Sequence, residues 1–342
     1  MLLFRRINLL ALVLCFVVVV FGAYVRLSNA GLGCPDWPGC YGHVTVTAAA
    51  DEPATDVARD FPSRPVVEAP KAWKEMTHRY LVGVLTSLIV CLVVLAWLDR
   101  SRHAPRRLVL ALPAVVLVQI VFGALTVTMK LNPLVVTTHL FLGLTTLALL
   151  WWLWLRGIAE APAVPVTPGA GRMRGLAALA LLVVIGQIFL GGWTSSNYAA
   201  LACPDFPACL GSFAPQTGLA QAFGVWHGTG ANYEYGILDG AARATIHLLH
   251  RYGALLVSLV LGGLAIFLLT TARTVLWRRM GWALLGALLL QVGIGISIVE
   301  LHLPLWLADA HNAGAALLLL TVVALNFFAW RRPEIDPGTA GA

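Results

Sequence analysis

Four histidines fall into two equally spaced pairs, and imidazole is a common ligand for iron and other metals. His78 precedes His139 by the same interval that separates His250 from His311. Each lies in an apolar stretch long enough to cross a membrane, where an ionisable side chain is costly and usually functional. An isolated histidine there would more often hydrogen-bond across helices, but two matched pairs favour ligation of a metal.

Two imidazoles with no nearby cluster of carboxylates or thiolates suit the two axial positions of a haem iron. A zinc site normally requires three or four protein ligands, and the core of a helical bundle is a common place for a haem. Arg79 and Arg251 directly follow two of the histidines. They could pair with haem propionates or anchor the chain at the membrane interface, and the sequence leaves both roles open.

The two pairs differ three residues upstream of their first histidine, where Glu75 stands in one copy and His247 in the other. A spacing of three puts two side chains on one helix face. Glu75 could therefore take protons or stabilise positive charge at the edge of a haem, or it could be a solvated acid that favours the helix dipole. His247 could be a spare ligand or a propionate partner.

Two cysteine pairs, Cys34–Cys40 and Cys203–Cys209, share the pattern C-P-D-aromatic-P-small-C. Both lie in segments expected to face the oxidising side of a membrane, so we predict a disulfide in each. Each bond could be a structural staple or a redox pair. For Cys34–Cys40, which lies nearer the acid-bearing half, neither role is preferred.

The segments that must position these residues are predicted to be membrane helices. Of the 342 residues, 59% are hydrophobic and 11% are charged, whereas a soluble domain carries about 25% charged residues. The net charge of +7 is spread over short loops and does not indicate nucleic-acid binding. A cleaved signal peptide is the alternative for the first span, but its length favours a retained helix. Spans near the roughly 20 residues required are expected at about 7–27, 77–98, 108–128, 135–155, 175–195, 245–270, 280–300 and 308–330.

Arginines concentrate in the short segments on one side of these spans, which predicts that both termini are cytoplasmic. The opposite side carries most of the acids and two long loops, at about 28–74 and 196–243. We expect these loops to face the periplasm, and the chain to be a multi-pass protein of a bacterial inner membrane. Residues 46–70 are predicted to be a solvated loop with a short surface helix.

The chain repeats itself, because residues 22–42 align without gaps to 191–211, and His-Arg-Tyr at 78–80 recurs at 250–252. We predict an all-α polytopic membrane protein whose eight transmembrane helices form two pseudo-symmetric four-helix bundles, with parallel repeats. The expected divisions are an N-terminal bundle at 1–156, a cytoplasmic linker at 157–174, a C-terminal bundle at 175–332 and a cytoplasmic tail at 333–342.

At these residues the chain resembles the haem A synthase family over nearly its whole length. The resemblance rests on R-L-x-x-x-G-L-x-C-P-D-W-P at 26–38, Glu75-x-x-His78-Arg79, His139, His250-Arg251 and His311. It implies a membrane oxidoreductase that oxidises the C8 methyl of haem O to the formyl group of haem A. The oxidation would proceed by successive hydroxylations with water as the oxygen source, and the product would serve haem-copper terminal oxidases.

The resemblance also implies roles for individual residues. His78 and His139 would flank the substrate haem O, whereas His250 and His311 would bind a haem b cofactor. Glu75 would be the essential carboxylate, and the Cys34–Cys40 pair would take part in electron or haem handling. Implied partners are haem O synthase as substrate donor, the assembly machinery of terminal oxidases and the lipid bilayer; a homo-oligomer is compatible with the resemblance.

Two other functions compete with this one. An electron-transfer cytochrome b would hold two permanent haems, and a haem carrier or assembly factor would hold haem only transiently. A cytochrome b predicts comparable surroundings in the two halves, which the difference between Glu75 and His247 disfavours.

Overall fold

The computed structural model describes residues 2–99, 105–158, 170–215, 217–228 and 230–331, and every regular element in these ranges is a helix. Eight of the described helices are long and apolar enough to cross a membrane, which confirms the predicted number of spans. They are α1 (Leu2–Leu27), α4 (Ala69–Leu98), α5 (Arg106–Thr128), α6 (Pro133–Ile158), α7 (Ala170–Ser196), α9 (Gly240–Thr271), α10 (Val275–Glu300) and α11 (Leu305–Trp330).

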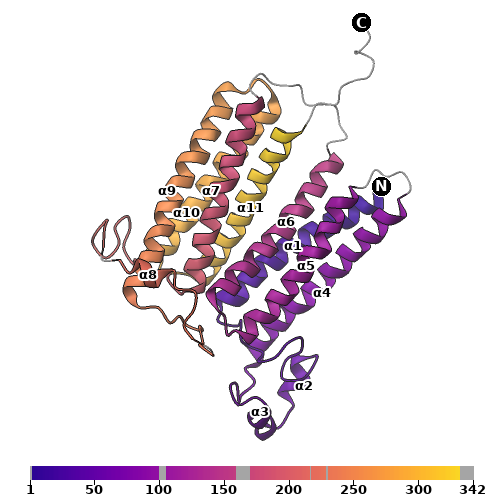
Figure 1. Cartoon of the computed structure of the whole chain (residues 1–342), viewed down its shortest axis with the longest axis vertical. Helices are drawn as coiled ribbons and strands as arrows, with labels where there is room; N and C mark the ends of the chain where they lie inside the picture. The colour runs from indigo at the N-terminus through magenta and orange to yellow at the C-terminus, as the bar shows by residue number, and fades with distance from the viewer. Residues whose placement is uncertain (1, 100–104, 159–169, 216, 229, 332–342) are drawn as a thin grey trace.

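The eight long helices form two bundles that stand side by side, α1, α4, α5 and α6 in one and α7, α9, α10 and α11 in the other (Figure 1). The bundles meet where α1 and α6 pack on α7 and α11. Hydrogen bonds cross this interface, including one from the Trp151 indole to the Leu320 carbonyl at 2.9 Å. The predicted all-α fold with eight spans is confirmed.

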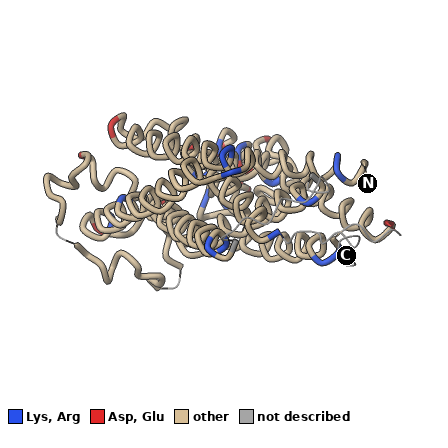
Figure 2. The backbone as a smooth tube through the Cα atoms, turned by 90° about the horizontal axis from the view of Figure 1, so that it is seen from above, with Lys and Arg blue, Asp and Glu red and all other residues tan. Residues whose placement is uncertain are grey.

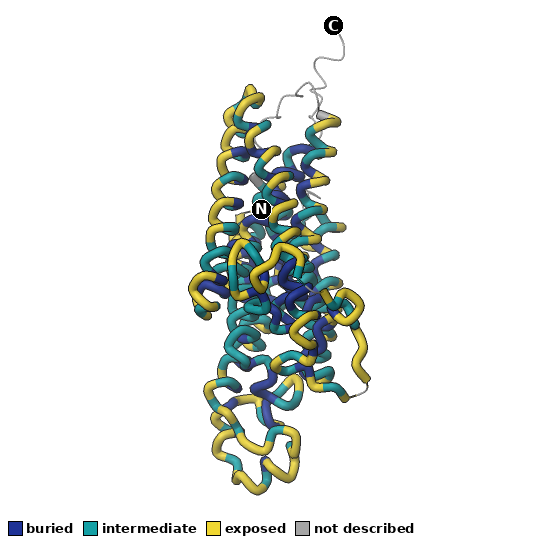
Figure 3. The backbone as a smooth tube through the Cα atoms, turned by 90° about the vertical axis from the view of Figure 1, so that its left-hand side faces the viewer, coloured by how far each residue is buried: buried dark blue, intermediate teal, exposed yellow. Residues whose placement is uncertain are grey.

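A continuous apolar core runs through both bundles, built mainly from leucine, valine and alanine. Exposed residues follow the outward faces of the helices (Figure 3), and many of them are large and apolar, such as Leu117 and Leu259. Charged residues are sparse along the helices (Figure 2). Apolar side chains on the outside are stable in lipid but not in water, so the chain is a multi-pass membrane protein.

Several helices begin earlier than the sequence predicted, and for α4 and α9 this changes where the histidines lie. α4 begins at Ala69 rather than near residue 77, and α9 begins at Gly240 rather than near 245. Their first turns carry a charged residue, Lys71 in α4 and Arg243 in α9, and precede the apolar span. The Asp239 carboxylate caps α9 by accepting from the Ala242 amide at 2.8 Å, as is typical of a helix N-terminus. The first histidine of each pair therefore lies two to three turns inside its helix.

The first long loop contains two short helices, α2 (Val46–Ala50) and α3 (Ala54–Asp60), where one surface helix was expected. It is more than a solvated connection, because it buries a small core of its own that includes Tyr41, Val46 and Met76. The second long loop contains the single short turn α8 (Leu219–Ala222). An ion pair between Arg64 and Glu234 joins the two loops.

The predicted linker at 157–174 lies mostly outside the described residues, as does the predicted tail at 333–342. At the edges of the linker, α6 continues to Ile158 and α7 begins at Ala170. The division of the chain at these points stays a prediction.

Candidate functional site

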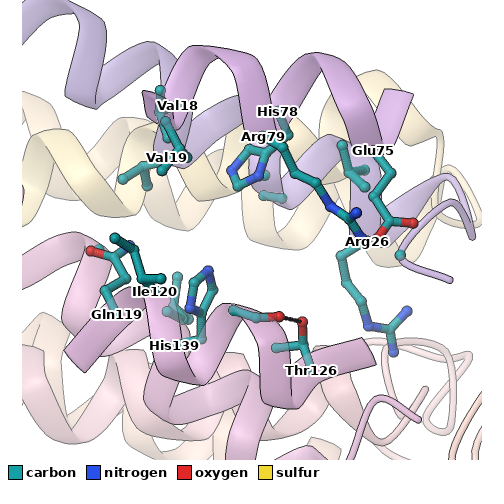
Figure 4. Close-up of a pocket in the computed structure, with 18 of the residues that line it drawn as sticks. Val18, Val19, Arg26, Glu75, His78, Arg79, Gln119, Ile120, Thr126 and His139 are labelled. Carbon is teal, nitrogen blue, oxygen red and sulfur yellow. Dashed lines mark hydrogen bonds and ion pairs between the residues drawn. The ribbon is translucent and has the colours of Figure 1, made fainter. Parts of the chain in front are cut away.

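The first bundle encloses a cavity of about 620 Å³ between α1, α4, α5 and α6. Its size falls in the range of about 300–1,000 Å³ that is usual for sites of small molecules and cofactors. His78 and His139 line it from α4 and α6 and point into the space between these helices (Figure 4). Asn312, from the second bundle, also forms part of the wall.

Each of the four histidine rings packs against a glycine on a neighbouring helix. A Cβ added at Gly22 would lie 2.8 Å from the His78 Nε2, and one at Gly295 would lie 3.0 Å from the His311 Cε1. Corresponding contacts link Gly123 with His139 and Gly191 with His250. Small residues let membrane helices approach closely, and here they leave room for an imidazole at the same place in every copy.

The rings of the second histidine pair are separated by the distance that two ligands of one metal would require. The ring centroids of His250 and His311 lie 6.4 Å apart, with their planes at 77°. Two metal–nitrogen bonds of about 2 Å each, together with the radius of the two rings, require a separation of about 6 Å. The Nδ1 of His311 is buried and has no hydrogen-bond partner among the described residues. These observations fit an iron porphyrin held between the two rings.

Glutamine side chains hold both histidines of the second pair. The Gln187 Nε2 donates to the His250 carbonyl at 3.0 Å and lies 3.1 Å from the ring Nδ1. The Gln291 Nε2 donates to the His311 carbonyl at 3.1 Å and lies 3.3 Å from the ring Nε2. These contacts fix the position of each ring against a neighbouring helix.

The first pair lacks these glutamine contacts. In the aligned repeats Val18 occupies the place of Gln187, so no amide is present there. Gln119 occupies the place of Gln291, but its Oε1 accepts from the Thr146 hydroxyl at 3.2 Å. The buried Nδ1 of His139 has no hydrogen-bond partner in the described part of the chain. The first pair is thus held by different contacts, with the backbone of Val18 at the His78 ring and the backbone of Gln119 at the His139 ring.

Glu75 lies on the wall of the cavity and is only 6% exposed. Its Oε2 accepts from the Cys34 amide at 2.9 Å, and its Oε1 accepts from the Arg79 guanidinium at 2.5 Å. The alternative of a solvated acid in the first turn is therefore wrong, because α4 begins at Ala69 and the loop folds over Glu75. A buried carboxylate with two donors is placed to act on a molecule in the cavity.

His247 makes the corresponding contacts in the second bundle. Its Nδ1 lies 3.2 Å from the Cys203 amide nitrogen, and its Nε2 lies 3.2 Å from the Arg251 Nε. A neutral imidazole accepts a hydrogen bond at only one of its nitrogens. His247 can therefore satisfy one of these two donors at a time, whereas the Glu75 carboxylate satisfies both of its own.

Arg79 and Arg251 bind the cysteine loops in this structure. Arg79 donates to the Pro38 and Gly39 carbonyls. Arg251 donates to the carbonyls of Cys203, Asp205 and Ala208 at 2.6–2.7 Å. Each guanidinium thus fastens a loop to the helix that carries the first histidine of its bundle. Pairing of these arginines with haem propionates stays a prediction.

Both predicted disulfides are present. Cys34 and Cys40 are joined with a Cα–Cα distance of 4.8 Å, and Cys203 and Cys209 with one of 4.6 Å. All four cysteines are buried. The first loop contributes Trp37, among other residues, to the cavity wall. Its disulfide therefore shapes one side of the cavity, while a redox role for it stays a prediction.

In each disulfide loop, an aspartate side chain accepts two backbone hydrogen bonds from residues of the same loop. Asp205 accepts from the Leu210 amide at 2.7 Å and from the Gly211 amide at 2.8 Å. These donors, the Gly211 amide foremost, together with the charge of Arg251, lower the pKa of the Asp205 carboxyl. Asp36 makes the same contacts with Tyr41 and Gly42 in the first loop.

Sequence reasoning gave no role to Gln187, or to Arg26, which begins the family motif at 26–38 and also lines the cavity. A signal was present, because Gln187 aligns with Val18 and Arg26 aligns with Ser195 in the repeats. Polar residues that appear in only one copy of a membrane repeat are candidates for function. Among the described residues, no group of three or more His, Cys, Asp or Glu is placed to hold a metal ion, which disfavours zinc.

Comparison with known proteins agrees with this site. A relative from Shewanella oneidensis, named heme A synthase, is 44% identical over 94% of this chain and 96% of its own length. Proteins of the same name from Caulobacter sp. strain K31 and Halalkalibacterium halodurans are 29% and 25% identical, each over at least 90% of both chains. The family model COX15-CtaA, described as cytochrome oxidase assembly protein, matches residues 5–323. The chain therefore belongs to the COX15-CtaA family of cytochrome oxidase assembly proteins.

Proposed function

We propose that this protein is a haem A synthase, which oxidises the C8 methyl of haem O to the formyl group of haem A. The observation that carries the proposal is the first cavity, where two histidines face each other beside a buried carboxylate. The relative from Shewanella oneidensis, which matches nearly the whole chain, has this name. The product would be used by haem-copper terminal oxidases.

In this proposal one half of the chain binds the substrate and the other half binds the cofactor. His78 and His139 flank the substrate haem in the N-terminal half, residues 1–156. His250 and His311 bind haem b in the C-terminal half, residues 175–332. Support comes from the volume of the first cavity and from the 6.4 Å spacing of the second pair. When bound, the haem b supplies a one-electron redox centre.

The reaction replaces C–H bonds of the methyl group by C–O bonds. Each of two hydroxylations takes up one water and releases two electrons and two protons, and the resulting diol loses water to give the formyl group. Glu75 would receive protons at Oε1 or Oε2 and stabilise positive charge that develops at the methyl carbon. Because the cavity wall is mostly apolar, few groups other than the reacting water could attack the activated carbon.

The Cys34–Cys40 disulfide would serve this reaction, either by holding the cavity wall or by handling electrons or haem. Replacing Cys34 and Cys40 together by serine distinguishes the roles, with the Cys203/Cys209 double serine variant as the matched control. If both disulfides are structural, each double variant should lose about 2 kcal/mol of its free energy of unfolding, as expected for such short loops. A redox role predicts that only the first variant loses haem A formation while it still binds haem.

The protein would lie in the bacterial inner membrane with both termini in the cytoplasm and both disulfide loops in the periplasm. Support comes from the arginines in the short segments and from the two buried disulfides, which form in an oxidising compartment. Haem O synthase would deliver the substrate, and the assembly machinery of the oxidase would accept the product.

Extraction of the pigment from the purified full-length protein tests the proposal. Chromatography and mass measurement should find haem b together with haem O, its hydroxylated form or haem A. Haem b alone, in two copies per chain, would instead support an electron-transfer cytochrome. Substoichiometric haem b that exchanges readily would support a carrier.

A further inference from the structure

Arg26 lies in the last turn of α1 and lines the first cavity together with His78 and His139. The aligned position of the second bundle is Ser195, so this arginine belongs to one half only. The reaction proposed above gives it no part. A cation on the wall of a largely apolar cavity requires an explanation, because burying an unpaired charge is costly.

The guanidinium of Arg26 is only partly satisfied by the protein. Its Nη2 donates to the Ser195 carbonyl at 3.0 Å and to the Ser196 carbonyl at 3.4 Å, and its Cζ lies 4.1 Å from the centroid of the Tyr198 ring. The Nε is buried and has no hydrogen-bond partner among the described residues. Within the same residues no carboxylate lies within ion-pair distance of Arg26, and Tyr198 and the more distant Glu234 are the groups whose charge acts on it, whereas Arg79 is paired with Glu75. The cavity therefore offers one guanidinium to an incoming anion.

The position of Arg26 sets which end of the cavity would attract that anion. Figure 4 shows Arg26 and Glu75 at one end of the site, with Val18 and Gln119 at the other and the histidines between them. α1 ends at Leu27, so the charged end adjoins the first long loop. A flat molecule bound between the histidines would direct its anionic edge toward Arg26, while the Glu75 charge at the same end is balanced by Arg79.

We propose that Arg26 binds a propionate carboxylate of the substrate haem and thereby fixes the ring edge that faces Glu75; this inference rests on the function proposed above. Guanidinium and carboxylate form strong charge-assisted hydrogen bonds. On the haem O ring the C8 methyl is next to a carbon that bears a propionate. Holding that propionate at Arg26 places the reacting methyl at the end of the cavity where the Glu75 carboxylate lies.

The proposal is tested on the purified, haem-loaded full chain by combining a substitution of Arg26 with esterification of the haem propionates. Ferric haem b, which carries the same two propionates, and its dimethyl ester are titrated into wild type and Arg26→Gln, and binding is followed by difference absorption. Signals that disappear in His139→Ala are assigned to the first cavity. Wild type should bind the free acid about 10- to 100-fold more tightly than the ester. Arg26→Gln should lose this preference and bind the ester as wild type does.

Arg174→Gln is the matched control, because Arg174 also donates to a helix carbonyl, that of Ala329 at 3.2 Å, and lies over an aromatic ring, that of Trp330. It should keep the preference for the free acid, and Arg26→Lys should keep part of it. Equal weakening of both probes in Arg26→Gln would show that Arg26 only joins α1 to α7, and would overturn this inference alone. Failure of wild type to bind either probe in a His139-dependent way would overturn the proposed function as well.

Discussion

The two halves of the molecule share a scaffold but differ in how each holds its central residues. In the second half, glutamines contact both histidines and the rings lie 6.4 Å apart. In the first half these contacts are missing and the histidines line an open cavity. Under the proposed function, this difference would let the second bundle retain its haem while the first binds and releases one.

At the cysteine loops, the first half has the more complete set of hydrogen bonds. Glu75 satisfies two donors at once, whereas His247 satisfies one of two. In addition, α4 packs less extensively on α5 than α9 packs on α10. The first half therefore combines a firmly held loop with weaker packing between α4 and α5 alone, an arrangement that would let a substrate enter between these two helices while Glu75 stays fixed.

The largest expected effect is on the haem spectrum, and it should differ between the two histidine pairs. Replacing His311 by alanine should remove the spectrum of a low-spin, bis-imidazole haem from the purified protein, because one of two axial ligands is lost. His139→Ala should keep that spectrum. Reduced-minus-oxidised absorption and haem per polypeptide measure both, with gel filtration as a check on folding. Equal loss in the two variants would contradict the assignment of one resident haem to the second half.

A second substitution separates Glu75 from its counterpart. Glu75→Gln preserves the shape of the side chain but removes the proton acceptor, so haem A formation should fall by about 100- to 10,000-fold. The resident haem should be unaffected. His247→Gln should retain most haem A formation, since no chemistry is assigned to it. A similar fall in both variants would mean that loop attachment, rather than the carboxylate, limits the reaction.

The glutamines should give a smaller effect that is confined to the second half. Gln187→Leu and Gln291→Leu remove groups that orient the histidines, and the affinity for the resident haem should drop by about 10- to 100-fold. Gln119→Leu is the matched control in the first half and should leave that affinity unchanged. The affinity of each variant for its haem is measured by the rate at which the haem transfers to apomyoglobin. Unchanged transfer in the Gln187 and Gln291 variants would show that the amide contacts have no part in holding haem.

The smallest effect concerns pH and the second loop. Because hydrogen bonds lower the pKa of Asp205 in the folded loop, ionised Asp205 stabilises the loop at neutral pH. This stabilisation is fully present above the carboxyl's unfolded pKa of about 4 and is lost as the pH falls through the lower folded value. Hydrogen exchange of the Leu210 and Gly211 amides should therefore lose protection in acid. Asp205→Asn should remove this pH dependence, and its persistence would assign it to another group.

Much of the fold was predictable because it follows from local patterns. Hydropathy gave eight spans, and the repeat gave two bundles and the four histidines. The starts of α4 and α9 were missed because polar turns that extend a helix beyond the membrane carry no hydropathy signal. The two donors of Glu75 could not be predicted either, since the Cys34 amide comes from a loop whose folding depends on long-range contacts.

Asn312 forms part of the cavity wall in the first bundle, and it directly follows His311 in the chain. A single helix, α11, therefore serves as the partition between the place where a substrate would be oxidised and the residue that would bind the resident iron. Under the proposed function, electrons withdrawn on one side of this partition would reach the other side through protein, without a diffusing carrier. An external acceptor would then be needed only at the second bundle, away from the cavity in which the methyl group would react.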